Sequence, residues 1–191
     1  MKKTEIILIA LGSVSALLKI LGIPGMSILM VLSAFSLMMF YLFFSVGILN
    51  DLTFKQIFQI KSYEKVNSLK VVGSVLLGLV FCFSVLSFVF ELMFWRGAGL
   101  ILIFSLVQLI LGGAIILLCK KRFDEKLFAL RVKRIVFFIA ISLVLKSIPF
   151  EVLVRLQYKD TEYAEAFIKC VGEENDCEEY DKMIKQRSGI K

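Results

Sequence analysis

Long apolar stretches separated by polar segments dominate the pattern of the chain. Each stretch is close to the roughly 20 residues that an α-helix needs to cross the hydrocarbon core of a bilayer. The pattern therefore predicts an all-α, polytopic membrane protein with about five transmembrane helices. We place the expected spans at residues 5–23, 26–49, 71–94, 100–118 and 135–154.

Short turns arrange these stretches as two tandem hairpins plus one further helix. Pro24 and Gly25 lie in the turn between the first pair of stretches, and Gly97 and Gly99 lie in the turn between the second pair. Trp95, just before the second turn, is expected to anchor it at the membrane interface. We divide the chain into a first transmembrane hairpin (1–49), a cytoplasmic connector (50–70), a second hairpin (71–118), a basic cytoplasmic loop (119–134), a fifth transmembrane helix (135–154) and an acidic tail (155–191).

Two of the polar segments carry further expectations. In the connector, Phe54, Ile57, Phe58 and Ile60 favour either a short helix on the membrane surface or an ordinary connecting loop. In the tail we expect two short helical pieces, at 158–171 and 178–186.

The basic residues predict the orientation of the chain. Lys and Arg number two before the first span, four in 50–70 and seven in 119–134, against none and one in the two short turns. The positive-inside rule therefore places the N-terminus and both loops in the cytoplasm. Five spans send the tail to the other side, which in a bacterial inner membrane is the periplasm. The tail agrees with this placement, since it holds seven Lys and Arg against nine Asp and Glu.

Two cysteines in the tail fit an oxidising compartment. Cys170 and Cys177 have six residues between them. On the outer side of the membrane such a pair would oxidise to a disulfide, which would join the two short helical pieces. The alternative is two unrelated thiols.

The two hairpins form an internal repeat with an offset of 72 residues. The offset superposes Gly25 on Gly97, Ser15 on Ser87 and Ser33 on Ser105. It also places Lys19, the charge near the outer end of the first span, on Glu91, the charge near the outer end of the third. Because both hairpins have the same orientation, the repeat is parallel.

The residues at the two turns resemble a known family. Leu18-Lys19-Ile20 with Pro24-Gly25, and Phe90-Glu91-Leu92 with Trp95-Arg96-Gly97-Ala98-Gly99, are similar to the N-terminal hairpin of GldL, an inner-membrane motor component of gliding motility and type 9 secretion. The resemblance implies two degenerate copies of that hairpin, which in the family forms a ring around a partner's helix. Lys19 matches the family's membrane lysine. Leu37 and Leu109 stand where the family has its membrane glutamate, and the family's long cytoplasmic domain has no counterpart, so the resemblance implies the hairpin architecture without the proton-motor chemistry.

Charged side chains inside the spans are the candidate functional residues, because each costs roughly 2.5–3.5 kcal/mol on insertion scales. Lys19 and Glu91 lie at matching depth, which leaves three interpretations: a proton-linked switch, a structural ion pair, or two side chains that snorkel to the interface. Lys146 and Glu151 lie on either side of Pro149, which predicts a kink in the fifth span.

Small and amide residues mark expected helix contacts. Gly12 with Ala16, and Gly112 with Gly113, allow neighbouring helices to approach closely, and Gln108 is suited to a hydrogen bond between helices.

Composition excludes several function classes. Hydrophobic residues make up 59% of the chain and charged residues 20%, whereas soluble domains have about a quarter charged. The chain has no histidine and no phosphate loop, Cys-x-x-Cys pair or nucleophile elbow, so we expect no catalysis, cofactor or metal. The net charge is +7, and the basic residues lie beside the spans, which fits a role in membrane orientation better than nucleic-acid binding.

These observations predict a non-catalytic inner-membrane subunit. We expect it to assemble, within the lipid bilayer, with itself or with another membrane protein, and the GldL resemblance places that partner in motility or secretion machinery. The alternative is a small ion- or proton-coupled transporter or channel that uses Lys19, Glu91 and Lys146.

Overall fold

A computed structural model of the chain describes residues 2–50, 52, 54–57, 68–95, 97–118, 125–158, 160–171 and 177–188. This part of the chain is helical and contains no strand, which confirms the all-α fold class. The helices are α1 (Lys2–Ile20), α2 (Met26–Leu49), α3 (Phe54–Ile57), α5 (Ser68–Leu92), α6 (Ala98–Leu118), α7 (Glu125–Ser147), α8 (Phe150–Gln157), α9 (Thr161–Val171) and α10 (Glu178–Ser188).

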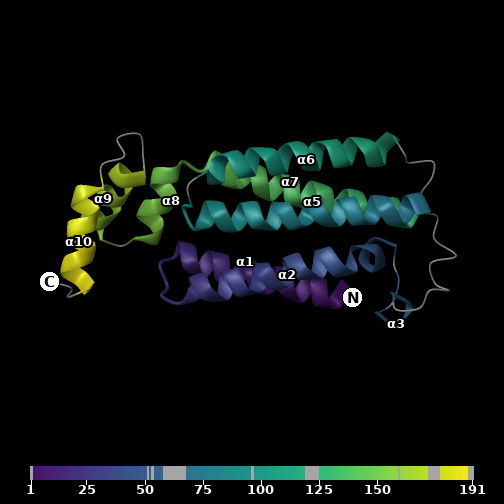
Figure 1. Cartoon of the computed structure of the whole chain (residues 1–191), viewed down its shortest axis with the longest axis horizontal. Helices are drawn as coiled ribbons and strands as arrows, with labels where there is room; N and C mark the ends of the chain where they lie inside the picture. Colours follow the sequence, from purple (N-terminus) through teal and green to yellow (C-terminus); the bar gives the residue numbers. More distant parts are fainter. Residues whose placement is uncertain are drawn as a thin grey trace.

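The long helices α1, α2, α5, α6 and α7 form an up-and-down bundle (Figure 1). Each runs antiparallel to the next, so the N-terminus lies at the same end as α3, and the short helices α8, α9 and α10 lie across the opposite end (Figure 1). We call these the N-terminal end and the tail end of the bundle. The helical pieces expected in the tail are confirmed as α9 and α10, whereas Phe58 and Ile60 of the connector lie outside the described residues.

The number of helices able to span a membrane is smaller than expected. Among the described residues, α2, α5 and α6 are long and apolar enough to cross, and a fourth span is possible only if α7 and α8 are counted together. Helix α1 has the length and lies along α2, but it carries Lys3, Glu5 and Lys19. The structure therefore supports a multi-pass membrane protein in which three or four helices are clearly apolar spans, with α1 packed beside them.

The predicted boundaries of the fifth span are wrong. Helix α7 begins at Glu125 instead of residue 135 and ends at Ser147, and α8 leaves it at an angle of 87°. Pro149 explains the break, because proline has no N–H to donate to the preceding turn and disfavours helical geometry in the residue before it. The kink expected at Pro149 is thus a right-angle bend, and Glu151 lies exposed on the first turn of α8.

The bend after α1 closes in a compact hydrogen-bonded motif. The N–H of Ile23 donates to the carbonyl of Leu18 over 3.1 Å, and the N–H of Gly22 donates to the carbonyl of Lys19 over 2.8 Å. Gly22 has a φ of 73°, and Gly25, which precedes α2, has a φ of 82°. This is a Schellman motif with its residue in the left-handed region at Gly22.

The bend after α5 repeats the same motif 72 residues later. The N–H of Trp95 donates to the carbonyl of Phe90 over 3.1 Å, and the N–H of Phe94 donates to the carbonyl of Glu91 over 3.3 Å. Phe94 has a φ of 55° and Gly97 a φ of 82°. The internal repeat found in the sequence is therefore a repeat of backbone conformation at the two bends.

Aromatic side chains at the centre of the bundle join α2, α5 and α7. Tyr41, Phe81 and Phe138 are almost fully buried. The rings of Phe81 and Phe138 stack with their centroids 5.1 Å apart, and Tyr41 lies 5.3 Å from Phe81. Their contact fixes the positions of three helices around one point.

Small residues let the helices approach as expected at some positions and not at others. A Cβ on Gly12 would lie 3.4 Å from Ser33 of α2, and one on Gly113 would lie 3.5 Å from Ile135 of α7. Among the described residues, no atom of another helix lies within 4 Å of a Cβ on Gly112, so the helix contact expected there is not seen. The closest approach was missed in the sequence: a Cβ on Gly78 of α5 would lie 2.8 Å from the Tyr41 carbonyl and overlap Ser45 of α2.

Candidate functional site

A buried ion pair joins α1 to α7 at the N-terminal end of the bundle. Glu5 of α1 accepts two hydrogen bonds from Arg134 of α7, 2.7 Å from Nε to Oε1 and 2.6 Å from Nη2 to Oε2. The hydroxyl of Tyr41 in α2 donates to Glu5 Oε1 over 2.9 Å. A bidentate Arg–carboxylate pair is among the stronger polar contacts in proteins, and here it connects α1, α2 and α7.

A second arginine lies beside this pair. Arg131 of α7 is 1% exposed. Its guanidinium donates to the carbonyl of Leu49 over 3.2 Å, to Oδ1 of Asn50 over 3.0 Å and to Oγ of Ser74 over 3.2 Å. Because α2 ends at Leu49, this carbonyl has no partner within its own helix, and a cation there also interacts favourably with the helix dipole.

The tail end of the bundle uses the same kind of contact. Lys19 of α1 is 8% exposed, and its Nζ donates to the carbonyl of Leu92, the last residue of α5. Nζ also lies 5.6 Å from the centroid of the Phe94 ring, and Gln157 of α8 donates to the same Leu92 carbonyl over 3.3 Å. Lys19 is therefore buried against the end of α5 and does not snorkel to the surface.

Lys19 and Glu91, for which an ion pair was one of three interpretations, do not pair. Within the part of the chain that the structure describes, no ion pair joins them. Oε2 of Glu91 is buried and has no hydrogen-bond partner among the described residues, and the opposite charge that acts on Glu91 is Lys146. Lys146 is exposed, and its Nζ lies 4.0 Å from the position of a Cβ on Gly99. The three charged side chains thus all lie at the tail end of the bundle. Lys19 contacts the end of α5, whereas Glu91 and Lys146 are neighbours of each other.

The remaining predicted residues lie as follows. Pro24 and Gly25 are exposed in the first bend, and Trp95 is 44% exposed at the second bend, with its ring 4.6 Å from Phe90. Gln108 of α6 has a buried Oε1 that accepts no hydrogen bond from another helix among the described residues.

An apolar slot runs between α1 and α7. It has a volume of about 320 Å³ and is lined by side chains within residues 8–20 of α1, 30–37 of α2, 85–92 of α5 and 137–145 of α7. Helices α2 and α5 form its floor, since they pack directly on each other, and α1 and α7 form its walls. Ala16, expected to serve helix contact, lines this slot and also packs against the core.

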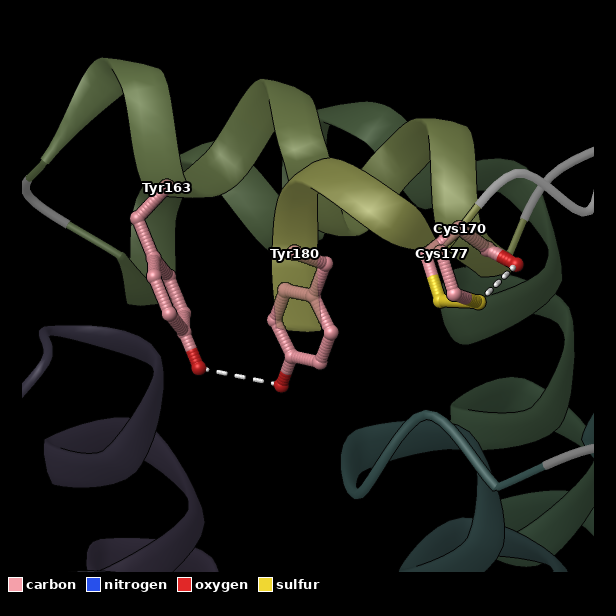
Figure 2. Close-up of a disulfide and its surroundings, with 4 residues drawn as sticks. All are labelled: Tyr163, Cys170, Cys177 and Tyr180. Atoms are coloured by element: carbon pink, nitrogen blue, oxygen red, sulfur yellow. Dashed lines mark hydrogen bonds between the residues drawn. A yellow bond between two sulfur atoms is a disulfide. The ribbon is translucent and has the colours of Figure 1, made fainter. Parts of the chain in front are cut away.

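The disulfide expected in the tail is present. Cys170 at the end of α9 and Cys177 just before α10 are bonded, with their Cα atoms 4.3 Å apart (Figure 2). The hydroxyl of Tyr163 donates to that of Tyr180 over 3.0 Å on the other side of the same helix pair (Figure 2). Burial is the main reason that the pKa of Tyr180 lies above its ordinary value. The two helices are therefore held together by one covalent bond and by aromatic packing.

The cluster at the N-terminal end was missed in the sequence. Glu5 stands at the edge of the first apolar stretch, and Arg131 and Arg134 lie in a segment interpreted as a loop. These arginines lie at helical spacing from the apolar residues that follow them. That spacing in the sequence would have predicted a start of α7 closer to the observed one. Among the described residues, no group of three or more His, Cys, Asp or Glu side chains could hold a metal ion.

Comparison with known proteins adds no relative. No protein-family model, curated protein or solved structure matches this chain. The likeness to GldL therefore rests on the hairpin residues alone.

Proposed function

We propose that this chain is a non-catalytic integral membrane subunit that assembles with copies of itself or with another membrane protein. The observation that supports this most strongly is the use of Glu5 and Arg134 to tie α1 to α7. Charges that serve transport face a water-filled path, whereas the slot described inside this bundle is apolar. The buried polar contacts at the N-terminal end thus support an architectural role.

Helix α6 offers the face for assembly. It lies at the edge of the bundle (Figure 1), and one side of it exposes apolar residues such as Leu100, Ile103, Val107 and Ile110. A second transmembrane helix can pack against an exposed apolar helix face of this kind.

The proposed location is a bacterial inner membrane with the N-terminus in the cytoplasm and the tail in the periplasm. In support, the N-terminus and α8 to α10 lie at opposite ends of the bundle (Figure 1). The bond between Cys170 and Cys177 also favours an oxidising compartment for the tail. Motility or secretion machinery remains our proposal for the partner, on the basis of the GldL-like hairpins.

Native mass spectrometry of the protein released from its membrane in mild detergent tests the assembly. We expect a defined oligomer or a stoichiometric complex with another membrane protein. Val107→Arg should disrupt it, because it places a charge on the exposed apolar side of α6. Val75→Arg is the matched control, since Val75 is similarly exposed on α5. A monomer in mild detergent, or equal effects of both variants, would contradict the proposed role of α6.

The second candidate is a proton-linked transporter or channel, and one observation favours it. Glu91 has a carboxylate oxygen that is buried without a hydrogen-bond partner among the described residues, with Lys146 as the nearby opposite charge. Proton flux into liposomes that contain the purified protein separates the two functions. The assembly proposal predicts equal flux for the wild-type chain and for Glu91→Gln, whereas a flux that Glu91→Gln abolishes would favour transport.

A further inference from the structure

The slot between α1 and α7 is closed at both ends. At one end, Arg134 of α7 donates two hydrogen bonds to Glu5 of α1. At the other end, α1 contacts α8, and Lys19 reaches across to the carbonyl of Leu92. Between these contacts, side chains of both helices line the slot, which forms an apolar window between α1 and α7.

The length of the slot matches one leaflet of a bilayer. Its lining on α1 runs from Leu8 to Ile20, over which a helix rises roughly 18 Å. Half of the hydrocarbon core of a bilayer is about 15 Å thick. On α2, α5 and α7 the lining likewise belongs to the half of each helix nearest the tail end. The slot therefore lies in the leaflet on the side of α8 to α10.

The volume of the slot fits a hydrocarbon chain and not a helix. A chain about 4 Å across and 18 Å long occupies roughly 200 Å³, which is accommodated by the 320 Å³ available. A helix about 10 Å wide and of the same length occupies more than roughly 1,000 Å³. A transmembrane helix from a second copy could cover the slot but could not enter it.

A positive charge stands at the tail end of the slot. Lys19 has three N–H donors, and the structure assigns one hydrogen bond to them, to the carbonyl of Leu92. No carboxylate lies within ion-pairing distance of Lys19 among the described residues. A buried ammonium gains strongly from an anionic partner. Leu92 itself lines the slot, so this charge lies where a chain that entered from the tail-side leaflet would end in its headgroup.

We propose that the slot binds one acyl chain of an anionic glycerophospholipid from the tail-side leaflet, with the phosphate of that lipid held at Lys19. The terminal methyl of the chain then points toward the Glu5–Arg134 pair. The lipid fills the window between α1 and α7, which makes it a structural component of the bundle.

Photo-crosslinking in lipid nanodiscs tests the proposal. The probe is a phosphatidylglycerol with a diazirine near the end of one acyl chain, and mass spectrometry maps the labelled peptides. We expect labelling of the lining residues of α1 and α7. Ala16→Phe fills the slot and should lower this labelling about tenfold, which corresponds to roughly 1.4 kcal/mol of lost binding. Ala114→Phe is the matched control, because Ala114 is exposed on α6 outside the slot.

The headgroup contact is tested with two probes that carry the same acyl chain and differ in their headgroup. Lys19→Gln should lower labelling by the phosphatidylglycerol probe and leave labelling by a diacylglycerol probe, which has no phosphate, unchanged. If Ala16→Phe fails to fold in detergent, Ser13→Phe takes its place, because Ser13 lies at the exposed mouth of the slot.

Three results would overturn the proposal. They are equal labelling of α6 and the slot, labelling that Ala16→Phe does not change, and occupation of the slot by a second copy in place of the probe. The oligomeric state is measured separately, so the failure of lipid binding and the failure of assembly are distinguishable.

Discussion

At the scale of single residues, buried cations bind the free carbonyls at the ends of helices. Arg131 binds the carbonyl of Leu49 at the end of α2, and Lys19 binds that of Leu92 at the end of α5. In both cases a cation from a distant segment satisfies a group that its own helix leaves unpaired. The Glu5–Arg134 pair adds a contact between opposite charges to this pattern.

Breaking the Glu5–Arg134 pair should destabilise the bundle. Glu5→Leu leaves the Arg134 guanidinium without its carboxylate, and losing one partner of a buried pair costs about 3–5 kcal/mol. Unfolding in mild detergent by a chemical denaturant measures the loss. The double variant Glu5→Leu with Arg134→Leu should lose less than the sum of the single variants, and Glu151→Leu on the exposed face of α8 is the control. Additive losses would show that the pair contributes no coupling.

Some of these residues were evident from the sequence and others were not, for a physical reason. Lys19 and Glu91 were found because a charge inside an apolar stretch is costly and conspicuous. Glu5 and Arg134 stand at the edges of apolar stretches, where a charge is common. That they meet depends on the rotation of α1 and α7 about their axes, which the one-dimensional pattern does not contain. For the same reason, the equal depth of Lys19 and Glu91 did not decide whether the two side chains pair.

At the scale of elements, the two bends of the repeat share one backbone conformation but not one sequence. Gly22 adopts the left-handed region without strain, whereas its counterpart Phe94 adopts it as a bulky residue. Phe94 is buried and packs against Phe150 of α8 and Phe167 of α9, with ring centroids 5.3 and 5.8 Å away. The tail therefore holds the second bend in a conformation that glycine provides in the first.

Substituting the glycines that precede α2 and α6 should cost stability through the backbone alone. Gly25 and Gly97 both have a φ of 82° and nothing within 4 Å of a Cβ. Gly25→Ala and Gly97→Ala should each lower the free energy of unfolding by about 1–2 kcal/mol, because an L-residue is disfavoured there. Gly112→Ala, equally open but helical, should raise it by up to about 1 kcal/mol. Thermal unfolding in detergent measures all three, and a loss at Gly112 equal to that at Gly97 would contradict the backbone explanation.

Hydrophobicity predicted the elements well wherever the membrane determines their ends. The turns at Gly25 and Gly97 lie where the sequence placed them. The start of α7 was not predicted, because its first turns mix charged and apolar residues and are held by the contacts of Arg131 and Arg134 with other helices. A hydropathy pattern identifies the apolar part of a helix and does not report how far the helix continues in a polar sequence.

At the scale of the whole molecule, the bundle carries a small cap made of α8, α9 and α10. The cap joins the bundle through Phe94 and Gln157 and closes on itself through the Cys170–Cys177 bond. Helix α10 packs mainly on α9, so its order depends on few contacts. The bond therefore has its main effect on α10 and little effect on the bundle.

Removing the disulfide should loosen α10 selectively. Cys170→Ser should lower the stability of the α9–α10 pair by about 2–3 kcal/mol, because the bond closes a short loop. Hydrogen exchange measured by mass spectrometry should show faster exchange in α10 and unchanged exchange in α2 and α5. Cys82→Ser in α5 is the control, since Cys82 is a free cysteine. Equal exchange of α10 in the wild-type chain and in Cys170→Ser would show that aromatic packing alone holds the pair.

The right-angle bend between α7 and α8 has a consequence for reach. A helix that continued straight past Ser147 would extend from the bilayer by about 1.5 Å for each residue. Because α8 turns by 87° and the cap lies across the end of the bundle (Figure 1), each further helix adds height only by its width, about 10 Å. The protein thus presents a low, broad surface, and any partner of the tail must come close to the bilayer to touch it. Pro149, which causes the bend, therefore limits how far the tail extends from the bilayer.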